Sequence, residues 1–154
     1  MEINMVGMGT VQSRILSIHK AEKDRITGAS DVITGYINDP HPRVRREAII
    51  ALGKLKDPES ITYLVNALSD SDRSVREAAL AGVLRIGSRS AEIPVIRLLG
   101  DLDPGIRIGA LCVLGRIGTE QSIGPVTRLA DDPFFDVRDE AARAATEIRK
   151  RNRL

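Results

Sequence analysis

The feature that most constrains this chain is a segment that recurs every 31 residues, starting at Asp39, Asp70, Asp101 and Asp132. The same register holds without gaps in four further sets of positions: Val44, Val75, Ile106 and Val137; Arg45, Arg76, Arg107 and Arg138; Ala48, Ala79, Ala110 and Ala141; and Leu55, Ile86, Ile117 and Ile148. A fixed period of this length predicts a stack of one supersecondary unit, in which neighbouring copies share a core.

Each unit is predicted to be a helical hairpin. Apolar residues recur at helical spacing from Val44 to Leu55, with charged residues on the opposite face. Asp57 and Pro58 then break the helix, and a shorter apolar stripe from Ile61 to Leu68 predicts a second one. Aromatic residues make up 3% of the chain, so the core is built from aliphatic side chains that suit close helix packing. The predicted class is therefore all-α.

We expect a single domain over residues 1–154. A degenerate unit over 8–38 is indicated by Arg14, which falls in the arginine column, and it is followed by full repeats at 39–69, 70–100 and 101–131. Residues 132–154 form a half repeat that closes the stack, and terminal units of this kind are usually atypical.

Two kinds of repeated position, which we call columns, are interpreted as structural: those that hold a small residue and those that hold a charged residue in each repeat. Alanine in one column lets neighbouring hairpins approach closely. Glycines near the end of the first helix, at Gly53, Gly87, Gly115 and Gly118, are interpreted as helix stops. Each arginine can reach the aspartate of its own or a neighbouring turn, which predicts a structural ladder of Asp39, Arg45, Asp70, Arg76, Asp101, Arg107, Asp132 and Arg138.

The repeated pattern D-x4-[VI]-R-x2-A-x6-[LI] resembles the HEAT-like repeats of the phycobilisome-lyase type, over roughly residues 29–148 and more weakly 8–28. This resemblance implies a right-handed α-solenoid of about five hairpins, an inter-repeat ladder of aspartate and arginine, and second helices that line a concave face. Unrelated activities share this solenoid, so the resemblance specifies the fold far better than the function.

Reactive groups are few, and we expect no catalytic residue, no cofactor and no metal site. Cys112 is the single cysteine, and with His19 and His41 it has no spacing that suits zinc. The HEAT-like iron-dependent hydroxylases of deoxyhypusine carry His-Glu pairs, whereas here His19 precedes a lysine and His41 a proline. The sequence favours a protein that is not an enzyme.

The second helices carry the first candidate binding site, because Asn66, Arg97 and Arg128 share one column and Tyr63 lies nearby. We call these four residues the second-helix strip. It could engage acidic side chains or a phosphate-bearing partner, or it could be an ordinary solvated face. Phe134 and Phe135 occupy turn positions that are polar in other units, and they either cover the end of the core or anchor a partner.

The leading functional hypothesis is a cytoplasmic adaptor that binds another protein, one with an acidic surface, as part of a larger complex. The alternatives are a bilin lyase-like subunit or chaperone acting on a chromoprotein, and a weak nucleic-acid-binding module. Nucleic acid is disfavoured because the net charge is only +2 and the basic segment 148–154 suits the end of a helix dipole. Neither a signal peptide nor a membrane span is expected, and Met1–Thr10 is unpatterned, so it could dock on a partner.

Overall fold

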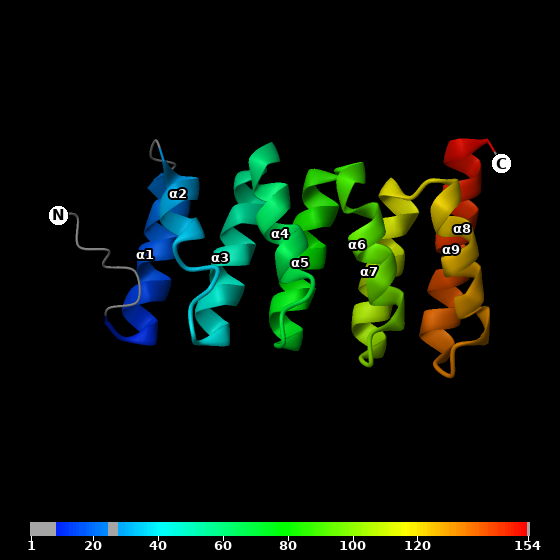
Figure 1. Ribbon diagram of the computed structural model, residues 1–154, viewed down its shortest axis with the longest axis horizontal. Coiled ribbons are helices and arrows are strands. Elements are labelled where there is room, and N and C mark those ends of the chain that lie inside the picture. The colour runs from blue at the N-terminus through cyan, green and yellow to red at the C-terminus, as the bar shows by residue number, and fades with distance from the viewer. Residues whose placement is uncertain (1–8, 25–27, 154) are drawn as a thin grey trace. The chain divides into compact units, whose positions relative to one another are not determined.

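The computed structural model describes residues 9–24 and 28–153, and in this part of the chain it contains helices and no strands. Long first helices alternate with short second helices, as the 31-residue repeat predicts, so the all-α class is confirmed (Figure 1). The first helices are α1 (Val11–Asp24), α3 (Pro42–Leu55), α5 (Arg73–Ile86), α7 (Pro104–Ile117) and α9 (Phe135–Asn152). The second helices are α2 (Ala29–Thr34), α4 (Ile61–Ala67), α6 (Glu92–Arg97) and α8 (Glu120–Thr127), with 3-10 turns at Pro58–Ser60, Arg89–Ala91, Leu98–Gly100 and Arg128–Asp131.

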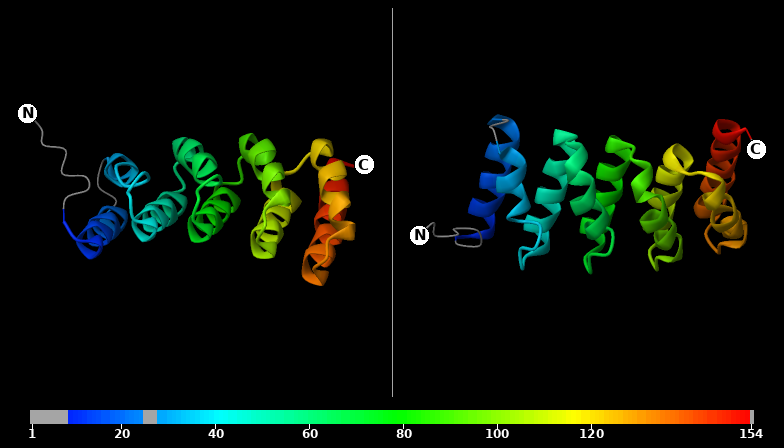
Figure 2. Two further views of the ribbon diagram at one scale, coloured as in Figure 1. Left: turned by 60° about the horizontal axis from the view of Figure 1, so that its bottom comes forward. Right: turned by 45° about the horizontal axis from the view of Figure 1, so that its top comes forward.

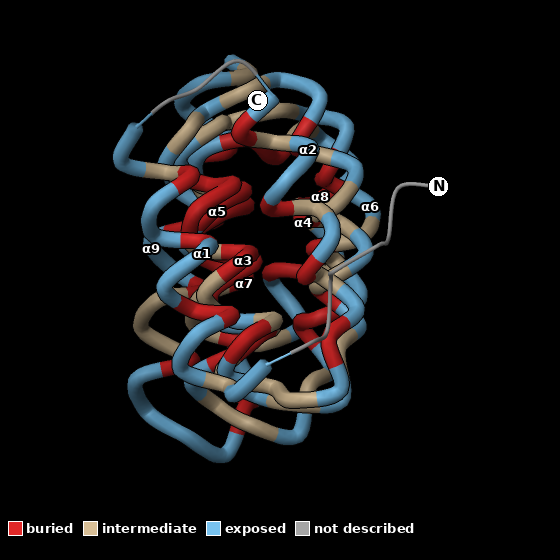
Figure 3. Tube along the Cα trace, turned by 90° about the vertical axis from the view of Figure 1, so that its left-hand side faces the viewer, coloured by how far each residue is buried: buried red, intermediate tan, exposed pale blue. Residues whose placement is uncertain are grey.

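The chain forms two compact units, with the boundary between Arg85 and Ile86. In the first unit α1 packs on α2 and α3, and α3 packs on α4. The helices α1 and α3 lie on one side and α2 and α4 on the other, with buried positions on their inner faces (Figure 3). Large, fully buried side chains of this core include Ile18, Ile33, Ile49, Leu52 and Leu64.

The second unit is built in the same way. Its first helices α7 and α9 pack against each other, α6 packs on α7, and α8 packs on α9 (Figure 2). Ile106, Leu111, Leu114 and Ile148 are fully buried between them. Arg151 near the C-terminal end of α9 donates hydrogen bonds to the carbonyls of Gly115 and Gly118, so this basic side chain satisfies the last turn of α7.

The aspartate that opens each repeat fixes the turn before the first helix. Its carboxylate accepts a hydrogen bond from the backbone N–H two residues later, at 2.8 to 2.9 Å, in all four repeats: Asp39 from His41, Asp70 from Asp72, Asp101 from Asp103, and Asp132 from Phe134. This bond closes an Asx turn, which sets the direction in which the helix leaves. It accounts for an aspartate in every copy of the repeat.

Two of the glycines interpreted as helix stops do not end a helix. Gly87 has a left-handed φ of 71° just after α5, and Gly118 follows α7, as a stop requires. Gly53, however, lies inside α3 and is buried, and a Cβ added there would come within 2.8 Å of the Gly82 Cα in α5. Gly115 lies inside α7, and a Cβ added there would lie 3.6 Å from the Ala144 Cα of α9, an ordinary contact distance. The stop interpretation is wrong for Gly53 and Gly115, because both lie inside a helix, and Gly53 also allows two helix backbones to approach closely.

Candidate functional site

The arginine column joins consecutive turns in both units. Arg45 donates from Nε and Nη2 to the two carboxylate oxygens of Asp70, each at 2.8 Å, and from Nη1 to the Asp39 carbonyl at 2.9 Å. Arg107 makes the same contacts with Asp132, at 2.8 and 3.0 Å, and with the Asp101 carbonyl. Each guanidinium therefore holds the turn before its own helix and the aspartate of the next repeat.

The degenerate N-terminal unit takes part in this ladder. Arg14 Nε lies 2.8 Å from Asp39 Oδ2, and Nη2 donates to Oδ1 at 3.2 Å, with both side chains nearly inaccessible to solvent. At the other end, Arg138 donates to the carbonyls of Asp132 and Pro133. Because each of these groups is bound to a turn of its own or a neighbouring repeat, the ladder offers little to a substrate.

The ladder also shifts the acidity of its carboxyl groups. Burial alone would raise the pKa of Asp70, but the hydrogen bonds from Arg45 and from the Asp72 N–H prevail and lower it. Asp132 behaves alike, since burial is outweighed by the hydrogen bonds from Arg107 and the Phe134 N–H, and its pKa is lowered. Both carboxyl groups are therefore stronger acids in the folded protein than in the unfolded chain.

These lowered pKa values predict how stability changes in acid. A carboxylate whose folded pKa is depressed stabilises the fold fully above its ordinary value of 3.8, and loses that contribution as the pH falls through the folded pKa. Asp70→Asn should therefore be less stable than the wild type above about pH 5, and the difference should shrink below the ordinary value. Urea unfolding at a series of pH values measures this, with Asp24→Asn at an exposed site as control. A difference independent of pH would contradict the prediction.

The second-helix strip is divided between the two units. Tyr63 is half-buried and Asn66 exposed on α4 of the first unit. Arg97 is the last residue of α6, and Arg128 follows α8 at the start of a 3-10 turn, both exposed in the second unit. Neither arginine forms an ion pair or hydrogen bond with another described residue. The two side chains are free to meet a partner.

The two phenylalanines are exposed and lie beside arginines of the ladder. Phe134 is 51% exposed at the N-cap of α9, and Phe135 is 69% exposed at its first position. Each ring lies beside an arginine of the ladder, with Arg107 5.6 Å from the Phe134 centroid and Arg138 5.7 Å from that of Phe135. Both alternatives for the pair, covering the end of the core or anchoring a partner, stay predictions.

Cys112 is a poor nucleophile. It lies on α7, and its Sγ donates a hydrogen bond to Glu140 of α9 at 3.2 Å. Desolvation by burial, together with the Glu140 hydrogen bond and negative charge, raises the pKa of the thiol to about 11. Since the thiolate is the reactive form, the local environment suppresses covalent chemistry at this residue.

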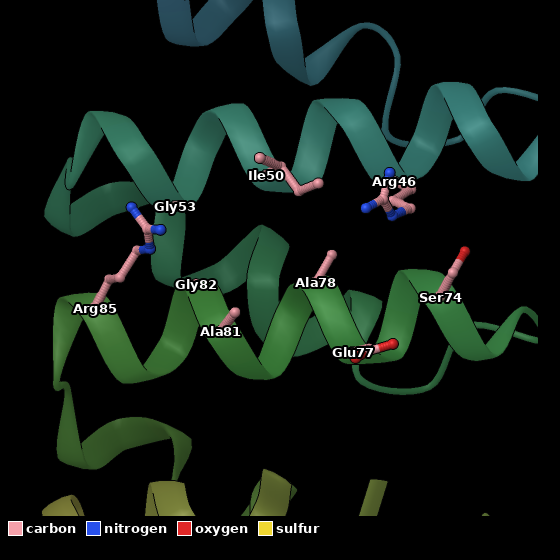
Figure 4. A pocket seen from close by; sticks show the side chains of 9 residues that line it. All are labelled: Arg46, Ile50, Gly53, Ser74, Glu77, Ala78, Ala81, Gly82 and Arg85. Atoms are coloured by element: carbon pink, nitrogen blue, oxygen red, sulfur yellow. The ribbon is translucent and has the colours of Figure 1, made fainter. Parts of the chain in front are cut away.

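A groove of about 310 Å³ runs between α3 and α5 of the first unit. Its floor contains Gly53 and Gly82, and Figure 4 shows Arg85 extending from α5 toward Gly53 while Arg46 lies at the other end. Arg46 already pairs with Glu47 at 2.7 Å. The groove is explained by the close approach of two helices with small residues, so its shape follows from packing.

A second pocket, of about 240 Å³, lies between α2 and α4 and was missed at the level of sequence. We call it the carboxylate pocket; it is lined by Ser30, Asp31, Thr34, Asp57, Glu59, Ser60, Thr62 and Tyr63. Only Tyr63 was predicted to lie in a binding site. The other residues come from two different repeats, and their meeting follows from helix packing that no single column of the repeat displays.

Buried polar side chains join the second helices of the second unit. Glu92 of α6 is buried, and its Oε1 accepts hydrogen bonds from Thr119 N at 2.6 Å, Thr119 Oγ1 at 3.0 Å and Ser122 Oγ at 2.6 Å. These donors open α8, so a carboxylate of one repeat caps the second helix of the next. Thr119 also forms the local cap of α8, because its Oγ1 accepts a hydrogen bond from the Gln121 N–H at 3.3 Å.

Two further features concern membranes and metals. Within residues 9–24 and 28–153 no helix has the length and apolar character needed to cross a bilayer. The same residues bring no three histidine, cysteine, aspartate or glutamate side chains together around a metal. Met1–Met8, the larger part of the proposed docking segment Met1–Thr10, lie outside the described residues.

Comparison with known proteins agrees with the repeat architecture. Residues 14–83 and 61–146 match the family model of HEAT repeats. A search of curated proteins finds no match. Among solved structures, the complex of CpcE and CpcF of phycocyanin lyase from Nostoc sp. PCC7120 contains a similar chain, with a TM-score of 0.76, 24% identity, and coverage of 97% of this chain and 65% of that one. An engineered protein solved by the Northeast Structural Genomics Consortium has a TM-score of 0.62 at 20% identity, with coverage of 88% and 68%.

These likenesses concern the fold. The chain spans just under two thirds of the length of the phycocyanin lyase chain that it matches. At 24% identity, the shared architecture does not show that this chain has the activity of the phycocyanin lyase complex.

Proposed function

Because the chain belongs to the HEAT-repeat family, we propose that it is a non-catalytic scaffold that binds another protein through the exposed faces of its second helices. The observation that carries this proposal is the pair Arg97 and Arg128. They occupy equivalent positions 31 residues apart, are exposed, and have no partner among the described residues. By contrast, each of the ladder arginines Arg45, Arg76, Arg107 and Arg138 donates a hydrogen bond to the backbone carbonyl of the aspartate six residues before it.

The chemistry of this pair specifies the kind of surface it meets. Two guanidinium groups without intramolecular partners present donors in a fixed fork, which suits carboxylates on a partner protein. Exposed charges of this kind guide association and select partners more than they add affinity. The proposed partner therefore carries acidic side chains at the spacing of one repeat.

Charge reversal tests the proposal. Affinity purification from the native host, quantified by mass spectrometry, should show that Arg97→Glu with Arg128→Glu reduces capture of the specific partner by about tenfold or more. Arg116→Glu is the matched control, because Arg116 is exposed in the last turn of α7 just as Arg97 is in the last turn of α6. Capture that survives the double reversal, with the melting temperature unchanged, would remove the proposal.

A second candidate is action on a bilin-bearing protein. It is favoured by one observation, the likeness to a chain of the CpcE and CpcF complex of phycocyanin lyase. The second helices of this chain offer Tyr63 and the carboxylate pocket in the first unit, but no cluster of aromatic side chains that would hold a tetrapyrrole. Mixing the protein with a bilin and recording its absorption distinguishes the two, since a shifted band would support the lyase-like role.

A further inference from the structure

We propose that the carboxylate pocket between α2 and α4 binds the guanidinium group of an arginine side chain on the partner protein. The inference rests on the proposed scaffold function and specifies chemistry at one place on the second-helix face. It concerns the first unit alone, and none of the pocket residues belongs to the arginine ladder.

The charge of the lining points to a cation. Asp31, Asp57 and Glu59 contribute three carboxylates, and no lysine or arginine is among the eight lining residues. None of the three carboxylates forms an ion pair with another described residue. Asp57 accepts hydrogen bonds from the Glu59 N–H at 3.1 Å and from Ser30 Oγ at 3.2 Å, whereas Asp31 and Glu59 are exposed at the rim. The pocket thus holds uncompensated negative charge.

A buried hydroxyl provides the second, independent observation. Ser60 lines the pocket, is 1% exposed, and its Oγ has no hydrogen-bond partner in the part of the chain that the structure describes. Leaving a buried hydroxyl unsatisfied destabilises a fold, so an unpaired group of this kind calls for an explanation. An N–H donor of a bound ligand would supply the missing partner.

The repeat shows that serine is not required at this position for folding. The column of Ser60 contains Ala29, Ala91 and Ser122. Ser122 is equally buried, but it donates to Glu92 of the preceding repeat. In the first unit the position of Glu92 is taken by Ser30, which bonds to Asp57 instead, so the Ser60 Oγ is left without a hydrogen-bond partner among the described residues.

Arginine suits this lining better than a metal ion or a lysine. The described residues contain no three-ligand metal cluster, and the acceptors are spread over two helices and a turn. A guanidinium carries five donors in one plane and can bond two carboxylates and a hydroxyl together, whereas an ammonium is a compact point charge. Tyr63 lines the same pocket, and the face of an aromatic ring attracts a guanidinium cation more strongly than it attracts a neutral side chain.

The test is a titration of the labelled full chain with short capped peptides, followed by amide shifts in NMR spectra at low salt. A glycine-flanked arginine peptide should shift amides within residues 30–34 and 57–63, and the same peptide with neutral citrulline should not. Ser60→Ala should weaken binding about tenfold while leaving stability unchanged or higher, because alanine occupies the column elsewhere. Ser122→Ala, the matched control, should lower stability and leave peptide binding intact.

The inference is overturned if citrulline binds as well as arginine, if lysine binds more tightly, or if Ser60→Ala binds as the wild type does. Glu59→Gln provides a second variant at an exposed site, where the fold is not at risk, and should also weaken binding. This titration needs no native partner. Arginine binding at the carboxylate pocket can therefore be disproved while the charge reversal at Arg97 and Arg128 still supports the scaffold function, or confirmed while the reversal has no effect. The two proposals are therefore tested separately.

Discussion

Replacing Arg107 by methionine is expected to lower the free energy of unfolding by about 3–5 kcal/mol. Arg107 is buried at 7% exposure and donates two of the three hydrogen bonds that the Asp132 carboxylate accepts, the third coming from the Phe134 N–H, as well as one to the Asp101 carbonyl. Methionine keeps the length of the side chain but leaves Asp132, which is 8% exposed, as an unpaired buried charge. The penalty of that isolated charge, rather than the loss of attraction, sets the size of the effect.

Chemical denaturation followed by circular dichroism measures this change. Arg143→Met is the control, because Arg143 pairs with Asp139 at 69% side-chain exposure and should cost at most about 1 kcal/mol. The double variant Arg107→Met with Asp132→Asn should recover part of the loss, since no buried charge remains. An Arg107→Met loss no larger than that of Arg143→Met would show that the ladder is not a structural element.

The second large effect is expected at Gly53. In Gly53→Ala the new methyl group would lie 2.8 Å from the Gly82 Cα, and backbone atoms cannot move aside as a flexible side chain can. The helices α3 and α5 must therefore separate, and overpacking of this kind costs about 1–3 kcal/mol. The change opposes the gain that alanine normally gives inside a helix.

Gly100→Ala is the matched control for Gly53→Ala. Gly100 ends the 3-10 turn Leu98–Gly100 and is followed by Asp101, and apart from its chain neighbours no atom lies within 4 Å of the position of an added Cβ. There alanine should raise stability by about 0.4–1 kcal/mol, through reduced freedom of the unfolded chain. The two substitutions should thus have opposite signs in thermal unfolding. If Gly53→Ala also stabilised the protein, the close contact of α3 with α5 would be wrong.

The fold was largely readable from the sequence, because the repeat multiplies a weak signal. One hairpin of moderate amphipathicity predicts little, but Val44 and its counterparts at a fixed spacing predict buried positions in every repeat, and all four are buried. Helix boundaries followed from the same register. The roles of the glycines were harder to predict. In the sequence, a glycine that ends a helix cannot be distinguished from one that lets a neighbouring helix approach.

The candidate sites were less predictable, for a physical reason. A repeat pattern records what each position needs for stacking, so it draws attention to departures such as Phe134 and Arg97. It does not record which side chains of different repeats meet, and the pocket joins Asp31 of one repeat to Glu59 and Ser60 of the next. The unpaired state of the Ser60 hydroxyl is a property of three-dimensional packing, because the same residue type at Ser122 is satisfied.

The geometry of the ladder has a consequence for how such a chain can change in length. Arg45 and Arg107 each require only an aspartate 25 residues later, and that aspartate need not belong to any particular copy. Gain or loss of a whole 31-residue copy therefore regenerates every junction, whereas an insertion of one or two residues breaks the bond on one side. Duplication and deletion of complete copies, rather than small insertions, are the evolutionary steps that this architecture tolerates.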